Sequence, residues 1–450
     1  MIDIDPGERL AIADALLGHA ERAGATEAEV VISADDSALT RFANSEIHQN
    51  VAETTISVNL RLVKGRRIAV VTTDRTDEEG LRAAAARAGE IASVVEELTD
   101  WAGLPEPGPI PDVPAAWVDA TAEASPEYRA EGVRAVVAAA DDAGTMAYGS
   151  FSTGAETIVV ANSKGIRAAQ RRTAAQLLTV SMSPDGGSSY AERAATDVRD
   201  IDPAGLGREV AAKARATDRA IALPAGDYPV VLETYAVVDI LDMLGYLGFS
   251  ALAVQEGRSF VEPGRRIGSE LVTIVDDGHD PAGLPMAFDY EGVAKERVTL
   301  VEHGICRDVV YDTQTAARDG RRSTGHGLPA PNTYGPFPLN LVMTKGDKTR
   351  DELIGGLARG LLITRFHYTN PIHPKLAIIT GMTRDGTFLV EDGKIVAPVR
   401  NLRFTQSYLE ALAGVSAVGH ELRTLRGFLG GVVAPMVRIE NWSFTGTTEH

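Results

Sequence analysis

The chain has little of several features that mark common classes of protein. One cysteine in 450 residues excludes both an intrachain disulfide and a multi-cysteine zinc site. No apolar run approaches the ~18–20 residues that span a bilayer. Residues 1–6 are acidic and lack the basic start and apolar core of a signal peptide. We therefore expect a protein of the reducing cytoplasm that has no contact with a membrane.

Clusters of basic residues are missing too. The formal net charge is −18, and short basic runs such as those at 171–172, 265–266 and 321–322 are isolated pairs of arginines. Nucleic-acid binding depends on a basic surface for most of its affinity, so we expect no nucleic-acid partner. We interpret the pairs as solvated strand ends or turns, and the acidity as a source of solubility.

The composition is that of a globular protein, with 44% hydrophobic and 24% charged residues. Apolar spacing predicts a helix over 7–23, and a strand follows at 29–35. Period-2 alternation predicts a hairpin over 53–73 with its turn at 64–66. A second helix, over 77–97, completes an order of elements typical of an α+β unit.

Domain boundaries are indicated by proline and glycine. At ~150 residues per domain, the length predicts two or three domains. Five prolines in residues 102–115 exclude a helix and predict an extended connector. Helices are expected over 126–142 and 203–217, and the Pro-Ala-Gly-Asp turn that follows the second is the best boundary. The predicted domains are 1–222, with helices flanking antiparallel strands, and 223–450, which is mixed and strand-rich.

The second half of the sequence predicts a different pattern of secondary structure. Residues 229–232 predict a short buried strand, and 234–250 a long apolar helix. Residues 320–338 form the longest irregular stretch, and loops of that length are usually functional or disordered. From 359 onward we expect short strands and turns.

Four stretches, in this order, carry a family resemblance. Residues 41–49 read Arg-Phe-Ala-Asn-Ser-Glu-Ile-His-Gln, 391–395 read Glu-Asp-Gly-Lys-Ile, 398–400 read Pro-Val-Arg, and 437–442 read Val-Arg-Ile-Glu-Asn-Trp. The set resembles the TldD/PmbA family of modulators of DNA gyrase and peptidase components, over nearly the whole chain. The resemblance implies a two-domain α+β architecture whose C-terminal domain helps to form a chamber.

The family's metal ligands are not found in this sequence. Catalytic members carry HExxxH on a helix and a distant cysteine, which together hold zinc. Here the corresponding helix has Asp239 and Asp242 where histidines would stand, and residues 425–431 contain no cysteine. The histidines offer no helical ligand pair, since the nearest two, His367 and His373, lie on either side of a proline. The resemblance therefore implies no metal in this chain and zinc in a catalytic partner.

Two weaker possibilities concern acidic groups and the cysteine. Asp239 and Asp242, with Glu233 or Glu256, could bind a hard cation, although a polar helix face is the favoured interpretation. Cys306 is flanked by a histidine three residues earlier, but strand geometry does not favour a Cys–His pair. We expect Cys306 to be a small buried apolar residue.

The best candidate for function is the segment 318–334. Its Ser-Thr-Gly-His stretch at 323–326 resembles the non-catalytic, PmbA/TldE-like branch, in which such loops line an inner chamber. A purely structural loop is an equally good interpretation. The residues that we assign to a peptide cleft are Arg318, Thr324, Gly325, His326, Asn332 and Tyr334.

Three functions follow from these observations. The first is a metal-free subunit of a TldD/TldE-like protease, which pairs with an HExxxH-bearing homologue as a heterodimer and acts on unfolded or short peptides. The second is a homodimeric peptide-binding or scaffold protein of the same fold without catalysis. The third is a hydrolase with an unrecognised site that uses Asp239, Asp242 and His326.

Overall fold

A computed structural model describes residues 5–448. Their strands form three sheets, and the mixture of helices and strands confirms the predicted α+β class. The helices are α1 (Pro6–Arg22), α2 (Glu78–Val94), α3 (Asp119–Ala122), α4 (Pro126–Asp142), α5 (Pro203–Ala216), α6 (Thr234–Leu247), α7 (Ala251–Gln255), α8 (Thr313–Arg318), α9 (Arg350–Gly355) and α10 (Tyr408–Ala413). In this part of the chain, no helix has both the length and the apolar character needed to cross a membrane.

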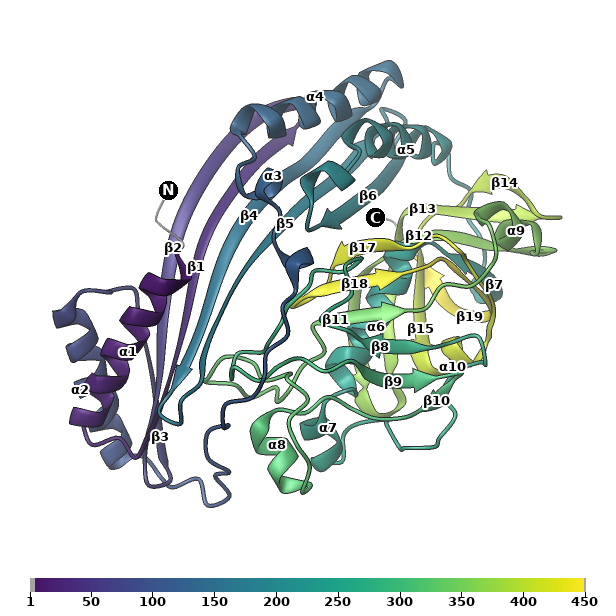
Figure 1. The fold of residues 1–450 in the computed structure, drawn as a ribbon. Helices are drawn as coiled ribbons and strands as arrows, with labels where there is room; N and C mark the ends of the chain where they lie inside the picture. Colours follow the sequence, from purple (N-terminus) through teal and green to yellow (C-terminus); the bar gives the residue numbers. More distant parts are fainter. Residues whose placement is uncertain (1–4, 449–450) are drawn as a thin grey trace.

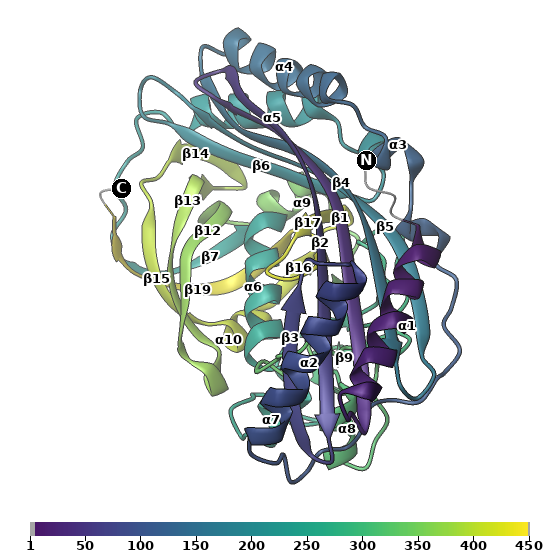
Figure 2. The same cartoon turned by 90° about the vertical axis from the view of Figure 1, so that its left-hand side faces the viewer.

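The first sheet is antiparallel and has the strand order β3-β2-β1-β4-β5-β6. Figures 1 and 2 show it as a long curved layer, with α1 and α2 at one end and α4 and α5 at the other. Apolar side chains that alternate along these strands pack under the helices, which is why the sheet buries one face. Its strands are β1 (Glu27–Ala43), β2 (Glu46–Lys64), β3 (Arg67–Thr73), β4 (Met146–Asn162), β5 (Arg167–Met182) and β6 (Ser188–Ala195).

Local sequence signals place the helices of this half. Asp5 caps α1, and Ser125 caps α4 directly before a proline at its first position. The proline-rich connector 102–115 has no strand or α-helix, as predicted. It lies against the first sheet, where the side-chain amide of Asn162 donates to the carbonyl of Pro105 over 2.9 Å.

The second sheet is mixed and has the order β10-β9-β8-β11-β18-β17. Its edge strand β17 lies beside β6 of the first sheet, as Figure 1 shows. Its strands are β8 (Ile274–Asp276), β9 (Val298–Glu302), β10 (Ile305–Cys306), β11 (Asn340–Met343), β17 (Arg423–Arg426) and β18 (Gly431–Ala434). The chain between α8 and β11 is irregular, which confirms the prediction for residues 320–338.

The third sheet has the order β12-β7-β19-β15-β13-β14, and β12 also pairs with β13, so that five of these strands close into a barrel. Helix α6 contacts β12 of the barrel and β18 of the second sheet. The strands are β7 (Gly226–Leu232), β12 (Arg359–His373), β13 (Ile378–Glu391), β14 (Lys394–Pro398), β15 (Leu402–Ser407), β16 (Val415–Val418), which pairs with β19, and β19 (Val437–Thr447).

Strand length in this region differs from our expectation. We predicted short strands from residue 359 onward, but β12 and β13 contain 15 and 14 residues. They extend because each pairs with the other through several register shifts, which lets irregular sequence remain in a strand. The first sheet ends at Ala195 and the next strand begins at Gly226, whereas the domain boundary at 222 stays a prediction.

Candidate functional site

The two stretches to which the family resemblance assigns metal ligands lie next to each other. The backbone amide of Phe428, in the turn between β17 and β18, donates to Asp242 Oδ2 on α6 over 3.2 Å. Gly427 is also in contact, because a methyl group at that position would clash with the same carboxylate. The fold therefore keeps the geometry in which a helix meets this turn, and fills it with an aspartate and a glycine.

The other aspartate of α6 is fully engaged. Asp239 accepts one hydrogen bond from the Thr369 hydroxyl and one from the Tyr408 hydroxyl, both over 2.7 Å. Burial raises the pKa of Asp239, and burial also raises that of Asp242 to about 7. These carboxyls act as internal hydrogen-bond acceptors.

The additional carboxylates that we considered for a cation lie elsewhere. Glu233 forms ion pairs with Lys213 over 2.6 Å and Arg350 over 3.4 Å, and Glu256 pairs with Arg258 over 2.6 Å. The structure therefore does not assemble these carboxylates into a cation site, in keeping with the favoured interpretation of a polar helix face.

Zinc, the metal that the resemblance implies, does not fit the donors at α6. Zinc sites use histidine, cysteine and carboxylate ligands in a tetrahedral set. The turn at 427–431 offers none of these side chains, and Asp239 has both oxygens in hydrogen bonds to hydroxyls. Among residues 5–448, no three His, Cys, Asp or Glu side chains are grouped so that they could hold a metal ion.

A cavity of about 420 Å³ lies on the other side of the same turn, and we call it the charged cavity. One wall is the first sheet, at 35–37 of β1, 154–156 of β4 and 172–174 of β5. The opposite wall is formed by the loop 284–286 and by residues 426–431. It thus lies between the first sheet and the turn that contacts Asp242.

The charged cavity contains groups of both signs. Arg172 and Glu156 form a close ion pair on neighbouring strands. Asp35 is half-buried, and burial together with Glu156 raises its pKa to about 6. Arg426 is exposed at the end of β17, where partial burial and Arg172 lower its pKa. Such an arrangement can bind a polar ligand with donors and acceptors at once.

The central part of the predicted peptide-cleft segment is buried. The His326 imidazole is fully enclosed, with Nε2 2.8 Å from Asp276 Oδ1 and Nδ1 3.0 Å from the Thr324 hydroxyl. The Lys295 ammonium lies 3.6 Å from Asp276 and donates to the carbonyl of Gly325. Burial alone would raise the pKa of Asp276, but Lys295 and His326 hold it at about 2. This cluster anchors the loop internally.

The remaining members of the segment lie in two other places. Arg318 donates to Asp100 over 2.7 Å, beside the proline-rich connector. Asn332 shapes a turn, since its side chain accepts from the Tyr334 amide and donates to the carbonyl of Gly335. The six residues are thus distributed over three environments, and their assignment to a peptide cleft stays a prediction.

An exposed aromatic patch surrounds this turn and the end of α6. Tyr246, Tyr334 and Phe428 are 39%, 49% and 62% exposed, and the ring of Tyr246 lies about 6 Å from each of the other two. We call these three residues the aromatic patch. A second cavity, of about 370 Å³, separates Tyr246 and Tyr334 from Pro371 and Pro374 of the β12–β13 hairpin.

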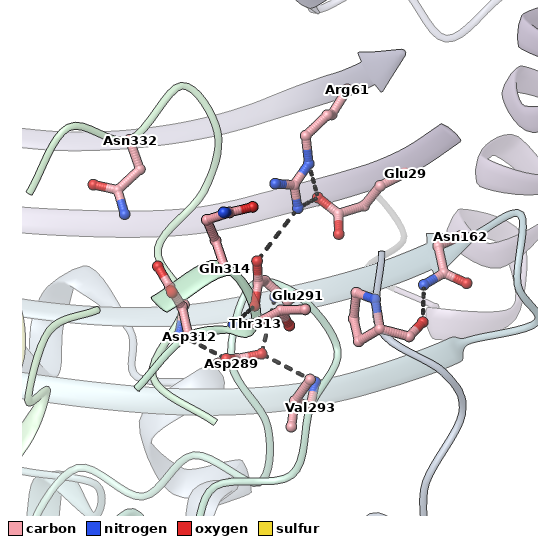
Figure 3. Close-up of polar contacts among 12 residues, drawn as sticks. Glu29, Arg61, Asn162, Asp289, Glu291, Val293, Asp312, Thr313, Gln314 and Asn332 are labelled. Carbon is pink, nitrogen blue, oxygen red and sulfur yellow. Dashed lines mark hydrogen bonds and ion pairs between the residues drawn. The ribbon is translucent and has the colours of Figure 1, made fainter. Parts of the chain in front are cut away.

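A buried ionic network that no sequence pattern indicated joins the two halves of the chain. Figure 3 shows Arg61 of β2 between Glu29 of β1 and Glu291 of a C-terminal loop. Arg61 donates to Glu29 over 2.6 Å and lies 3.6 Å from Glu291. Burial raises the pKa of Glu29 to about 7 and that of Asp289, in the same loop, to about 8. The groups come from distant segments, and no local pattern connects them.

The cysteine has the structural character that we predicted. Cys306 is fully buried in the core, and burial raises its pKa. His303, which we considered as its partner, is exposed and has its Nδ1 3.1 Å from the Glu270 carbonyl. Cys306 is therefore a core residue.

Two family models match this sequence. Residues 28–92 match domain 1 of the PmbA/TldA metallopeptidases, and residues 225–446 match their C-terminal domain. This chain belongs to the PmbA/TldD family. A metalloprotease of Methanothermobacter thermautotrophicus is 30% identical over 257 residues, which are 54% of this chain and 55% of that protein. A metalloprotease TldD homolog of Buchnera aphidicola is 28% identical over 49% of each. The chain thus aligns with about half the length of these relatives.

Solved structures of the family share the whole fold. TldE from Thermococcus kodakarensis superposes with a TM-score of 0.89 and 22% identity, over 97% of this chain and 100% of that one. A protein described as a modulator of DNA gyrase, from Thermotoga maritima, gives 0.86 and 20%, over 97% and 99%. At these identities the likeness concerns the fold.

Proposed function

We propose that this chain is the metal-free subunit of a two-subunit PmbA/TldD-family peptidase that cleaves unfolded or short peptides. The observation that carries the proposal is the contact between α6 and the β17–β18 turn. There the family resemblance expects zinc ligands, and this chain has Asp239 and Asp242 held by hydroxyls and a backbone amide. The catalytic zinc would be held by an HExxxH-bearing homologue, and we place the pair in the cytoplasm.

The aromatic patch supports a partner at this face. Exposed aromatic side chains that lie together are typical of the centre of protein interfaces. Tyr246 and Phe428 border the altered ligand site, so a subunit docked on them would lie next to it. This chain would then form one wall of the chamber in which the partner's metal acts.

A homodimer is the second candidate. A surface around one helix end can pair with its own copy about a two-fold axis, as in most soluble oligomers. In that case the same patch would join two metal-free chains, and the product would be a peptide-binding or scaffold protein without catalysis. Only the partner distinguishes the two candidates.

The deciding experiment is purification of the chain alone and together with an HExxxH-bearing homologue from the same cell. Each sample is assayed for zinc and for cleavage of an unfolded polypeptide, and a homologue lacking its motif glutamate serves as the matched control. We expect zinc and cleavage in the intact pair, zinc without cleavage in the control pair, and neither in this chain alone. Stoichiometric zinc with chelator-sensitive cleavage by this chain alone would contradict the proposal.

A variant of this chain tests whether the aromatic patch binds the homologue. Phe428→Ser removes one ring of the aromatic patch and places a hydroxyl there, at a side chain that is 62% exposed. We expect the variant to remain folded and to lose co-purification with the homologue. A wild-type chain that forms stable homodimers and does not bind the homologue would favour the scaffold candidate.

A further inference from the structure

The charged cavity has two opposed charges that no side chain of the described residues neutralises directly. Asp35 and Arg426 form no side-chain hydrogen bond or ion pair within residues 5–448, although both line this cavity. Asp35 lies on the first sheet, and Arg426 ends β17 on the opposite wall. Each lies in the electrostatic field of the other and of the Arg172–Glu156 pair, without a direct contact.

The other charged groups around the cavity already have side-chain hydrogen-bond partners. Glu156 accepts hydrogen bonds from Arg172 and from the Ser33 hydroxyl. Asp36 accepts from the Thr54 hydroxyl over 3.1 Å. Asp35 and Arg426 are therefore the charged groups of the cavity lining that have no side-chain partner among the described residues, and they lie on opposite walls.

A neighbouring carboxylate holds Arg426 by its backbone rather than by its side chain. Glu192 of β6 accepts the Arg426 backbone amide over 3.2 Å, and it also accepts from the Gln176 amide and the Tyr190 hydroxyl. These contacts hold the end of β17 against the first sheet by its backbone. The guanidinium is thereby positioned at the cavity and left without a partner.

We infer that the charged cavity binds a short peptide with both ends free, whose ammonium group faces Asp35 and whose carboxylate faces Arg426. Guanidinium groups bind carboxylates through two parallel hydrogen bonds, and this match favours a peptide end over a neutral ligand. The volume of about 420 Å³ lies within the range of small-molecule sites, about 300–1,000 Å³.

The cavity walls also suit a peptide backbone. The wall at 427–431 contains three glycines, so backbone groups can approach a ligand there without side chains between them. The inference rests on the proposed function for the source of the ligand, since such peptides would be fragments present in the chamber. The binding itself is a property of this chain alone.

The test uses isothermal titration of the purified chain, without partner or metal, with trialanine and its blocked forms. We expect N-acetylation or C-amidation of trialanine each to weaken binding by about tenfold or more, because each removes a charged hydrogen-bonding group. Arg426→Met should weaken binding of free trialanine to the same degree and abolish the effect of amidation. Asp35→Asn should likewise abolish the effect of acetylation.

The matched control is Arg322→Met, which removes a 92% exposed arginine outside the cavity and should leave binding unchanged. Equal affinity for free and doubly blocked trialanine, no binding at all, or an unchanged Arg426→Met variant would overturn the inference. Failure here is separate from failure of the proposed function. Cleavage by the intact pair can succeed when this titration fails, and the titration can succeed when no partner exists.

Discussion

Removal of the Arg61 guanidinium should destabilise the junction between the first sheet and the C-terminal loops. Arg61→Met keeps the length and apolar character of the side-chain stem while leaving Glu29 and Glu291 without their shared cation. Both carboxylates are almost fully buried, at 2% and 6% exposure. Loss of one partner from a buried ion pair costs about 3–5 kcal/mol, because the remaining charge is uncompensated. We expect the free energy of unfolding to fall by that amount near neutral pH.

The pH dependence of this fall in the free energy of unfolding provides a second, independent test. Burial raises the pKa of Glu29 from 4.5 to about 7, so the native state binds this proton more tightly than the unfolded chain. In the wild type, Glu29 therefore lowers stability by about 3 kcal/mol as pH rises from about 4.5 to 7. Arg61 opposes that rise in the pKa of Glu29, and its removal raises the pKa further. The cost of Arg61→Met should thus be smallest in acid and largest above about pH 7.

The assay is urea unfolding followed by tryptophan fluorescence, between about pH 5 and 9. Arg67→Met is the matched control, because it removes an arginine of the adjacent strand whose partner Glu97 is half exposed. Exposed pairs contribute at most about 1 kcal/mol, so the control should change little at any pH. An Arg61→Met curve that follows the control, or a cost independent of pH, would refute the reasoning.

Three further predictions concern other sites. Asp242→Asn should gain stability over the wild type as pH rises from about 4 to 7, because burial raises the pKa of the native carboxyl to about 7. A difference in thermal midpoint between variant and wild type that is the same at about pH 4 and about pH 7 would contradict this. Gly325→Ala should cost at least twice as much stability as Gly320→Ala in chemical denaturation. Both glycines have positive φ, a conformation that costs an alanine about 1–2 kcal/mol, but only at Gly325 would the added methyl clash with the Ala294 carbonyl. Equal losses of stability in the two variants would argue against that contact. Cys306 is fully buried and should react with a disulfide reagent only at the rate of unfolding, whereas immediate labelling would show that it is accessible.

Elements whose limits are set by nearby residues could be predicted from sequence. The helix expected at 126–142 is α4, Pro126–Asp142, because Ser125 and the proline after it define its start. The hairpin turn at 64–66 was predicted as well, since alternating residues end on a glycine with positive φ. Strands β12 and β13 were not, because their length depends on pairing with each other rather than on their own residues.

The site shows the same division. The resemblance located α6 and residues 425–431 separately, and it directed attention to the aspartates. Their contact through the Phe428 amide could not be predicted, because it joins segments 186 residues apart. Asp35 and Arg426 come from still more distant strands, and each looks like an ordinary surface charge in its own sequence context. Similarly, nothing around His326 in the sequence indicates that its partner is Asp276, 50 residues earlier.

The closed barrel has a consequence for how the protein is made. Strand β7 lies between β12 and β19, so Val230 is paired with Leu361 and Ile439, which the ribosome adds much later. In the first sheet, by contrast, every pairing except β1–β4 joins strands that follow each other in the sequence, and the whole sheet is complete by Ala195. During translation, β7 and the apolar helix α6 must therefore remain exposed while most of the second half is synthesised. Nascent chains stalled before β19 should accordingly be the form of this protein that chaperones bind.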